Sequence, residues 1–186
     1  KDLYVFDLKE GKRKKLFNRE IPEQLTKSKR IYAPAWHPSK DVLAAVQVED
    51  NTLNLVLYDM DKEETSIQSL TDHARSQQIF RPQWHPDGSR IYFAYTDGMA
   101  REIRFIDLAT NKVHNVIGDG TDDYRDVVVA PEGDYLFYSS DKTGIFNIYQ
   151  APLLDNGTID ASKEVQLTNV IGGAFMPDVS KKGELV

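Results

Sequence analysis

The sequence of 186 residues is long enough to bury a sizeable core, and its 40% hydrophobic and 10% aromatic content is that of a folded globular chain. The absence of cysteine excludes disulfides and thiolate metal sites. No apolar run approaches the roughly 20 residues of a membrane-spanning helix, so we expect no direct membrane span. Because both ends fall inside the repeat units described below, we expect the chain to be part of a longer one.

The net charge of −6 is distributed unevenly along the chain. Residues 1–30 hold ten Lys or Arg against five Asp or Glu, and the remainder holds 13 against 24. The basic run at residues 12–15 is typical of a solvated edge strand. It is short, it has no interleaved aromatic residues, and the acidic remainder would repel phosphate. The sequence therefore predicts no nucleic-acid partner.

One stretch sets the pattern for the whole chain. Residues 80–95 read as a strand, a Pro-Asp-Gly turn and a second strand rich in aromatic and β-branched residues. Related stretches occur at residues 31–38 and 129–138, and residues 179–186 form a truncated fourth copy. The turn positions are spaced by 48, 45 and 50 residues, at Pro38, Pro86, Pro131 and Lys181.

A second landmark has nearly the same period. A strand, a turn and another strand occur together at residues 3–17, 55–70, 103–117 and 148–168. A short carboxylate in such a turn favours an Asx turn, in which it accepts hydrogen bonds from backbone N–H groups two residues on. The turn positions are spaced by 52, 48 and 45 residues, at Asp7, Asp59, Asp107 and Pro152. Two independent landmarks with one period indicate internal repeats.

A period of about 40–50 residues with four strands per repeat is typical of the blades of a β-propeller. The pairs just described are strands c and d of each blade. Strands a and b are expected at 32–36 and 42–48, at 80–84 and 90–95, and at 125–129 and 134–139. Consecutive apolar residues, as at 91–95, indicate sheets that are covered on both faces. No stretch has a sustained apolar period of 3.6 residues, so very little helix is expected.

The sequence therefore predicts an all-β fold, a β-propeller of four-stranded antiparallel blades. The predicted units are a half-blade, three complete blades and a second half-blade, at residues 1–30, 31–78, 79–123, 124–173 and 174–186. Either the two half-blades pair and close a four-bladed ring, or the chain is an arc of a larger ring. Four blades are the small end of the range of propellers, which favours the arc.

The pattern Pro-x-Trp-His-Pro-Asp-Gly-Ser-x-Ile-Tyr-Phe at residues 82–93 resembles the PD40, or WD40-like, repeat of the TolB family, which has a Trp-Ser-Pro-Asp-Gly turn. Residues 139–149 resemble the Ser-Asp-x-x-Gly-x-x-x-Ile-Tyr segment of this family. The pair at 167–168 resembles the Leu-Thr that ends its blades. The chain departs from the pattern in His37 and His85, which replace Ser, and in Lys40, which replaces the turn glycine.

TolB-like propellers serve as periplasmic scaffolds and as domains of larger extracytoplasmic proteins. The resemblance therefore implies a non-enzymatic protein-interaction scaffold of the cell envelope, periplasmic or otherwise extracytoplasmic, with a protein partner. The same repeat also builds the non-catalytic propellers of tricorn-type and prolyl-oligopeptidase-type peptidases, so a gating or docking domain of a larger peptidase is the first alternative. A propeller enzyme of the lyase or glycosidase kind is the second.

No chemistry-bearing motif accompanies the repeats. The sequence has no Gly-x-Ser-x-Gly, no His-Glu-x-x-His and no Gly-x-x-x-x-Gly-Lys. We therefore predict no catalytic residue, no metal site and no cofactor within this segment. His37 and His85 occupy equal places in two blades, but Ala130 and Ser180 replace them in the other copies, so packing at the turns is expected rather than metal ligation.

The candidate binding site is a face built from loops. In a propeller the b–c loops and the loops that join strand d to the next strand a gather at one face around the channel. We call this the loop face, and its candidate residues are Glu49, Asp50, His73, Asp97, Asp119, Asp122, Asp123 and Asp141. Because the set is mostly acidic, we expect it to attract a basic peptide segment or a divalent cation. Trp36 and Trp84 are expected to anchor the packing between blades.

Overall fold

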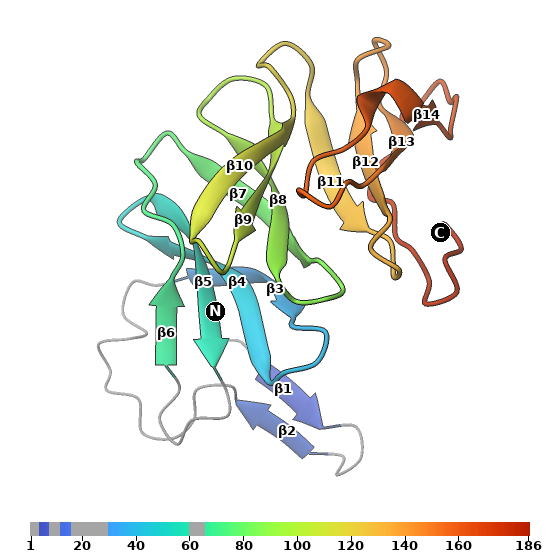
Figure 1. Cartoon of the computed structure of the whole chain (residues 1–186). Helices are drawn as coiled ribbons and strands as arrows, with labels where there is room; N and C mark the ends of the chain where they lie inside the picture. Colours follow the sequence, from blue (N-terminus) through green and yellow to red (C-terminus); the bar gives the residue numbers. More distant parts are fainter. Residues whose placement is uncertain (1–3, 8–11, 16–29, 60–65) are drawn as a thin grey trace.

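A computed structural model describes residues 4–7, 12–15, 30–59 and 66–186, and all statements below concern these residues (Figure 1). They form three four-stranded antiparallel sheets, each in simple a-b-c-d order. The first sheet contains β3 (Arg30–Trp36), β4 (Val42–Glu49), β5 (Thr52–Asp59) and β6 (Ser66–Ser69). The second contains β7 (Gln78–Trp84), β8 (Arg90–Thr96), β9 (Glu102–Asp107) and β10 (Lys112–Ile117). The third contains β11 (Tyr124–Val129), β12 (Tyr135–Ser140), β13 (Asn147–Pro152) and β14 (Val165–Gln166).

The all-β prediction is confirmed, because the described residues contain no α-helix and only one 3₁₀ turn, Ala161–Lys163. At the start of the chain, β1 (Tyr4–Asp7) and β2 (Lys12–Lys15) pair as an antiparallel hairpin, whose side chains lie outside the described part. At the other end, Val179 bridges Leu185 around the turn of the fourth copy. The predicted limits of the blades stay predictions. Strands β3 and β7 each begin one residue before the predicted start of their blade, at 30 rather than 31 and at 78 rather than 79.

Local hydrogen bonds explain why the hairpin turns form where they do. In the Pro-Asp-Gly turn, Gly88 N–H donates to the His85 carbonyl and Ser89 N–H donates to the Asp87 carboxylate. In the c–d turn of the second sheet, Asp107 accepts from Ala109 N–H at 3.1 Å, which is the predicted Asx turn, and also from Thr110 N–H at 2.9 Å. The predicted Asx turn at Asp7 and the turn that follows Asp59 lie outside the described residues.

The sheets stack face to face and share their cores. One cluster of buried side chains joins the first and second sheets, and another joins the second and third. Strand β8 shows how this works, because Ile91 and Phe93 belong to the first cluster and Tyr92 belongs to the second. Successive side chains of a strand point to opposite faces, so a sheet between two neighbours needs apolar residues at every position. This arrangement confirms the interpretation of the apolar run at 91–95.

Strands β3, β7 and β11 form the inner side of the arc, since β7 contacts both of the others (Figure 1). Each of these strands has an irregular register with the b strand beside it, and each irregularity contains one non-glycine residue with positive φ. These three residues are Ala33 (φ 50°), Arg81 (44°) and Asp126 (53°), and Met176 (56°) has the same conformation at the equivalent place in the last copy. A bulge of this kind kinks a strand and changes where its side chain points.

Neighbouring sheets also interlock through the repeated histidine. His37 lies against Gly88 in the turn of the next sheet, and a Cβ added to Gly88 would lie 2.5 Å from its Cε1 atom. His85 lies against Gly133 in the same way, where a Cβ would lie 2.9 Å from the ring. The Nδ1 atom of His37 accepts the N–H of Lys40 at 3.1 Å, and its ring meets Trp84 edge-on at 4.6 Å. These contacts agree with the packing role predicted for both histidines.

The two tryptophans differ, and the prediction is correct for only one of them. Trp84 is 9% exposed and donates its indole N–H to the Ala35 carbonyl of the first sheet at 2.9 Å. Trp36, its equivalent in the first sheet, is 49% exposed. The prediction that Trp36 anchors packing is therefore wrong for the described structure. Trp84 packs against the first sheet, which precedes its own. In the described part of the chain no four-stranded sheet precedes the first one, so Trp36 has no equivalent surface to pack against.

The threonines of the Leu-Thr pairs at 70–71 and 167–168 make the same hydrogen bonds in the first and third sheets. Asn54 Oδ1 accepts from the Thr71 hydroxyl at 3.0 Å and from His73 N–H at 2.7 Å. Asn147 Oδ1 accepts in the same way from the Thr168 hydroxyl and from Val170 N–H. These bonds fix the start of each d–a loop to the start of strand c. The loop face therefore begins from a rigid edge.

Candidate functional site

The loops that carry the predicted site residues lie at one edge of the arc. In Figure 1 the b–c and d–a loops of the second and third sheets lie at the top of the view, and their a–b turns lie below. The structure brings some of the predicted residues together and keeps others apart. Glu49 and Asp50 line one pocket, whereas Asp123 and Asp141 meet between the second and third sheets.

The pocket beside the first sheet has a volume of about 600 Å³. It is lined by Glu49, Asp50, Thr52, Asn54, Ser69, Leu70, Thr71, Asp72 and Asn111. Its central amide, Asn54, is already occupied by the Thr71 hydroxyl and the His73 backbone. Glu49 accepts the side-chain N–H of Gln47 at 3.1 Å. The pocket thus contains acidic side chains, and the Asn54 amide oxygen between them already accepts hydrogen bonds from within the protein.

His73 belongs to the framework of the loop face rather than to its surface. Its Nδ1 atom lies 3.2 Å from the Leu53 carbonyl, and its ring meets Tyr95 edge-on at 5.4 Å. Burial lowers the pKa of His73 below its usual value, and the nearby Arg104 guanidinium lowers it further. The neutral imidazole is therefore favoured, and its Nδ1–H donates to the carbonyl.

The carboxylates of the second sheet reach the surface. Asp97 and Asp119 are exposed, and Asp122 is partly exposed. Asp119 accepts the hydroxyl of Thr121 at 2.6 Å and its N–H at 3.0 Å, and these hydrogen bonds hold the pKa of the carboxyl below its usual value. Asp97 and Asp122 leave acidic charge on the rim of the loop face.

Asp123 and Asp141 are engaged within the protein. Asp141 accepts the backbone N–H of Asp123 at 2.8 Å, which ties the b–c loop of the third sheet to the d–a loop before it. The carboxylate of Asp123 forms an ion pair with Arg125. The hydrogen bond that Arg125 donates to Asp123 is the largest cause that raises the pKa of the Arg125 guanidinium, and it keeps Arg125 charged. These two carboxylates contribute less free negative charge than the sequence indicates.

Sequence reasoning missed the arginines that lie beside this pair. Arg101 lies over the ring of Phe80, 4.3 Å from its centroid, and Arg125 lies over the ring of Phe146 at 4.5 Å. We call these four residues the arginine–aromatic row. Asp123-Tyr124-Arg125 could have been recognised as an i, i+2 pair on one face of a strand. The sequence has no local signal that joins Phe80 to Arg101, because they meet only when the sheet has folded.

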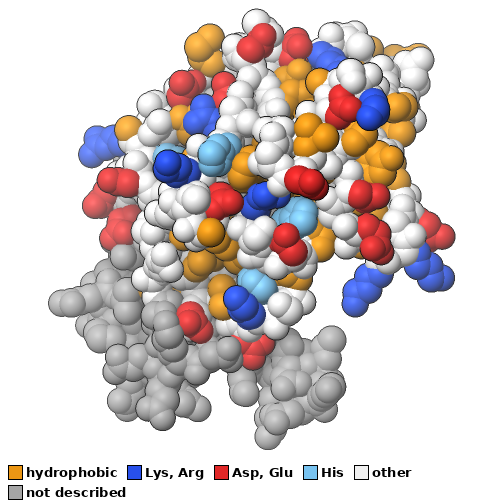
Figure 2. Space-filling view, in the orientation of Figure 1, with side chains coloured by type: hydrophobic (Ala, Val, Ile, Leu, Met, Phe, Trp, Pro, Cys, Tyr) orange, Lys and Arg blue, Asp and Glu red, His pale blue; other side chains and the backbone are white. Residues whose placement is uncertain are grey.

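A ladder of contacts runs beside the row along the inner strands. Arg81 and Asp126, the two charged bulge residues, form an ion pair with Nη1 and Oδ1 3.3 Å apart. The other oxygen of Asp126 accepts the Ser139 hydroxyl at 3.0 Å and the Met176 N–H at 3.2 Å. Asp126 thus links three successive copies. Figure 2 shows acidic, basic and hydrophobic side chains interspersed over the side of the molecule seen in Figure 1.

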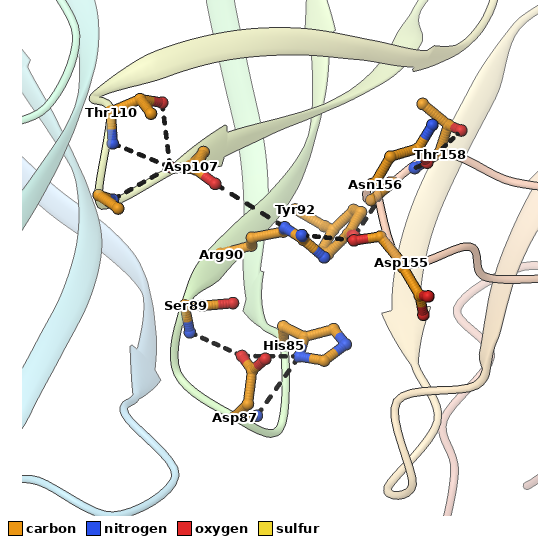
Figure 3. Close-up of polar contacts among 12 residues, drawn as sticks. His85, Asp87, Ser89, Arg90, Tyr92, Asp107, Thr110, Asp155, Asn156 and Thr158 are labelled. Carbon is orange, nitrogen blue, oxygen red and sulfur yellow. Dashed lines mark hydrogen bonds and ion pairs between the residues drawn. The ribbon is translucent and has the colours of Figure 1, made fainter.

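The opposite end of the second and third sheets is a structural junction (Figure 3). Arg90 donates to the Asp155 carbonyl at 2.6 Å, and the Tyr92 hydroxyl donates to the Gly157 carbonyl at 3.0 Å. Asn156 accepts the N–H and the hydroxyl of Thr158, so the Asn-Gly-Thr sequence forms a tight turn. His85 lies beside Asp87, with Nδ1 and Oδ1 2.8 Å apart. These contacts hold the two sheets together.

Two further findings concern the described residues as a whole. None of their His, Asp and Glu side chains form a group of three or more that could hold a metal ion. None of their helical segments is long and apolar enough to cross a bilayer.

Sheets that stack through shared cores, with their a strands side by side, define the fold of this chain as that of a β-propeller. No protein-family model matches the sequence, and no curated protein sequence matches it either.

Solved structures support the fold. The chain is similar to TolB from Acinetobacter baumannii, with 22% identity and a TM-score of 0.70 over 98% of this chain and 41% of that one. It is also similar to a puromycin-hydrolysing peptidase from Mycobacterium tuberculosis, with 18% identity and a TM-score of 0.66 over 91% of this chain and 26% of that one. Oligogalacturonate lyase from Vibrio parahaemolyticus is a third, with 11% identity and a TM-score of 0.67 over 98% of this chain and 51% of that one. The chain thus spans between 26% and 51% of the length of these proteins.

Proposed function

We propose that this chain is part of a larger TolB-like propeller that acts as a non-enzymatic protein-interaction scaffold of the cell envelope, in the periplasm or another extracytoplasmic compartment. The partner binds at the loop face. The observation that carries the proposal is the construction of this face: charged residues stand on its loops, and the Asn54–Thr71 bond in the first sheet and the Asp123–Asp141 bond between the second and third sheets fix loops that carry them. A rigid surface binds a partner without a large loss of conformational freedom. Similarity to the TolB fold favours this function.

Charge reversal tests the proposal in the full-length protein. The variant Asp97→Lys/Asp122→Lys changes the rim of the loop face, where both carboxylates reach the surface. A matched control, Glu132→Lys/Asp155→Lys, changes two exposed carboxylates at the opposite end of the sheets. Proteins that co-purify with the protein from native envelopes are measured for both variants. We expect the first variant to lose its partner and the second to keep it, and equal retention by both would refute binding at the loop face.

A second candidate is the gating or docking domain of a larger peptidase. It is favoured by the similarity to the puromycin-hydrolysing peptidase, of which this chain spans 26%. Such a protein needs a catalytic domain outside this segment. Labelling of the full-length protein by an active-site probe for serine hydrolases would select this candidate, and full-length protein that stays unlabelled while it holds its partner would select the scaffold.

A further inference from the structure

We propose that the arginine–aromatic row, Phe80, Arg101, Arg125 and Phe146, binds a carboxylate of an acidic peptide segment. The inference rests on the proposed function, because it names the chemistry of the partner at the loop face. It also differs from the expectation drawn from the sequence, in which the residues of this face were mostly acidic and a basic peptide segment or a divalent cation was the expected ligand. The geometry adds two positively charged side chains, Arg101 and Arg125, beside the acidic residues of the rim.

The row brings two guanidinium groups together on aromatic supports. Arg101 precedes β9 and lies over Phe80 of β7, whereas Arg125 of β11 lies over Phe146 of the third b–c loop. The N–H group of Tyr124 donates to the Arg101 carbonyl at 3.0 Å, which fixes the two arginines next to each other across the junction. A guanidinium held over a ring keeps its planar set of N–H donors available for a carboxylate.

The two arginines differ in how they are paired. Arg125 has Asp123 as its partner, and Asp126 nearby is held by Arg81, the Ser139 hydroxyl and the Met176 N–H. Arg101 has only the ring of Phe80: within the described part of the chain its guanidinium has no ion pair and no hydrogen bond. Burial lowers the pKa of Arg101 and the charge of Arg125 lowers it further, whereas the charges of Asp123 and Asp126 raise it. A bound carboxylate would favour the charged guanidinium in the same way as these two aspartates, and it would add the direct hydrogen bonds that Arg101 lacks.

The surroundings of the row favour a peptide over a free anion. Phe146 continues the row towards Phe175, with ring centroids 4.8 Å apart. Phe175 and Met176 are 48% and 66% exposed, and Ile145 beside Phe146 is 41% exposed. Exposed apolar side chains next to charged donors suit a segment in which an acidic residue is flanked by apolar ones. The neighbouring carboxylates Asp123 and Asp126 would repel phosphate, which carries more charge than a carboxylate.

The test uses fluorescence anisotropy with the full-length protein. The probe is a labelled nonapeptide with one central glutamate between leucine and phenylalanine, and both of its ends are blocked. A second peptide has glutamine in place of glutamate, and a third has glutamine with a free C-terminus, which separates a side-chain carboxylate from a terminal one. The variants are Arg101→Gln, Arg101→Lys and a control, Arg75→Gln, which removes an exposed arginine from another d–a loop.

We expect the glutamate peptide to bind about tenfold more tightly than the blocked glutamine peptide, as hydrogen bonds to a charged group imply. Arg101→Gln should abolish this difference, Arg101→Lys should restore part of it, and Arg75→Gln should leave it intact. Melting temperatures of the variants equal to that of the unsubstituted protein show that the fold is retained. Tighter binding of the free C-terminus than of the glutamate side chain would assign the anchor to a chain end and still support the site.

Other outcomes overturn the inference. Equal affinity for the two blocked peptides would exclude a carboxylate anchor, and an equal loss in Arg101→Gln and Arg75→Gln would reduce the effect to net charge. Displacement of the peptide by trigalacturonate at lower concentration would assign the row to an acidic sugar. If no peptide binds but Asp97→Lys/Asp122→Lys still releases the native partner, the carboxylate site is excluded and the scaffold function stands.

Discussion

The contact between His37 and Gly88 gives the sharpest test of how the sheets interlock. In the variant Gly88→Ala, the new Cβ would lie 2.5 Å from Cε1 of His37 and closer still to Nε2. Real Cβ atoms do not approach other heavy atoms so closely, so either the turn or the imidazole must move. The imidazole is held by the N–H groups of Ser39 and Lys40 and by the edge of Trp84. The strain therefore falls on the junction between two sheets.

The magnitude follows from two separate terms. Gly88 has φ +74°, and an alanine in this left-handed conformation costs about 1–2 kcal/mol. Overpacking against a fixed neighbour costs about 1–3 kcal/mol more. A total of about 3 kcal/mol would lower the melting temperature of a chain of this size by roughly 6–12 °C. Only the first term should remain when the imidazole is removed.

A double-mutant cycle separates the two terms. The free energy of unfolding is measured by urea denaturation for the unsubstituted protein, Gly88→Ala, His37→Ala and the double variant. We expect Gly88→Ala to cost about 1–3 kcal/mol less in the His37→Ala background than alone. Gly144→Ala is a control for the backbone term, because Gly144 has φ +89° and no atom within 4 Å of its added Cβ. If Gly88→Ala costs the same in both backgrounds, the histidine does not lock the turn and the reasoning is refuted.

Three further predictions follow from the hydrogen bonds of the fold. Asn54→Ala removes the acceptor of two bonds that fix the first d–a loop, and it should lower the free energy of unfolding by about 1–3 kcal/mol in urea denaturation. Asp126→Ala removes the acceptor of the Met176 N–H, which should loosen the fourth copy. Limited proteolysis should therefore cleave the chain in this copy faster than in the unsubstituted protein. Asp87→Asn should reduce the dependence of stability on pH between about pH 4 and 2. Burial alone would raise the pKa of Asp87, but the hydrogen bonds from Ser89 and the contact with His85 outweigh it and lower the pKa to about 2. Because the folded-state pKa is the lower one, Asp87 stabilises the protein above the unfolded pKa, and this contribution is lost as the pH falls through the folded one.

The first two of these predictions have a control in the same chain. Asn115→Ala removes an exposed amide that bonds only the Gly118 carbonyl, and it should change the free energy of unfolding by less than about 0.5 kcal/mol. Asp119→Ala removes a carboxylate that bonds only its own loop, and it should leave proteolysis of the last copy unchanged. An unchanged pH profile in Asp87→Asn would mean that other carboxyl groups dominate that range.

The sequence predicted the features that local chemistry determines. The Pro-Asp-Gly turn, the Asp107 turn and the apolar run at 91–95 each depend on residues within a few positions of one another, and each has its predicted structure. The period of the turns then led to stacked four-stranded sheets, because one sheet cannot bury both of its faces alone.

The contacts between sheets could not be read in this way. His37 meets Gly88, Tyr92 meets Gly157 and Arg101 meets Phe80 only because one sheet lies on or beside another. The candidate site depends on such contacts, so its acidic loop residues could be predicted from the sequence but the arginines beside them could not. Trp36 shows the opposite error: an equal place in the repeat does not provide an equal neighbour.

The bulge of the inner strands has a consequence for how such a ring can diversify. Alanine, arginine, aspartate and methionine occupy this one place in successive copies, so the bend is compatible with very different side chains. The residue at the bend is not part of either core cluster. The residue at the bend is thus not fixed by the apolar packing of the sheets. Except at Asp126, whose carboxylate holds the Ser139 hydroxyl and the Met176 N–H, the inner side of the arc can therefore change its chemical groups while the cores between the sheets stay the same.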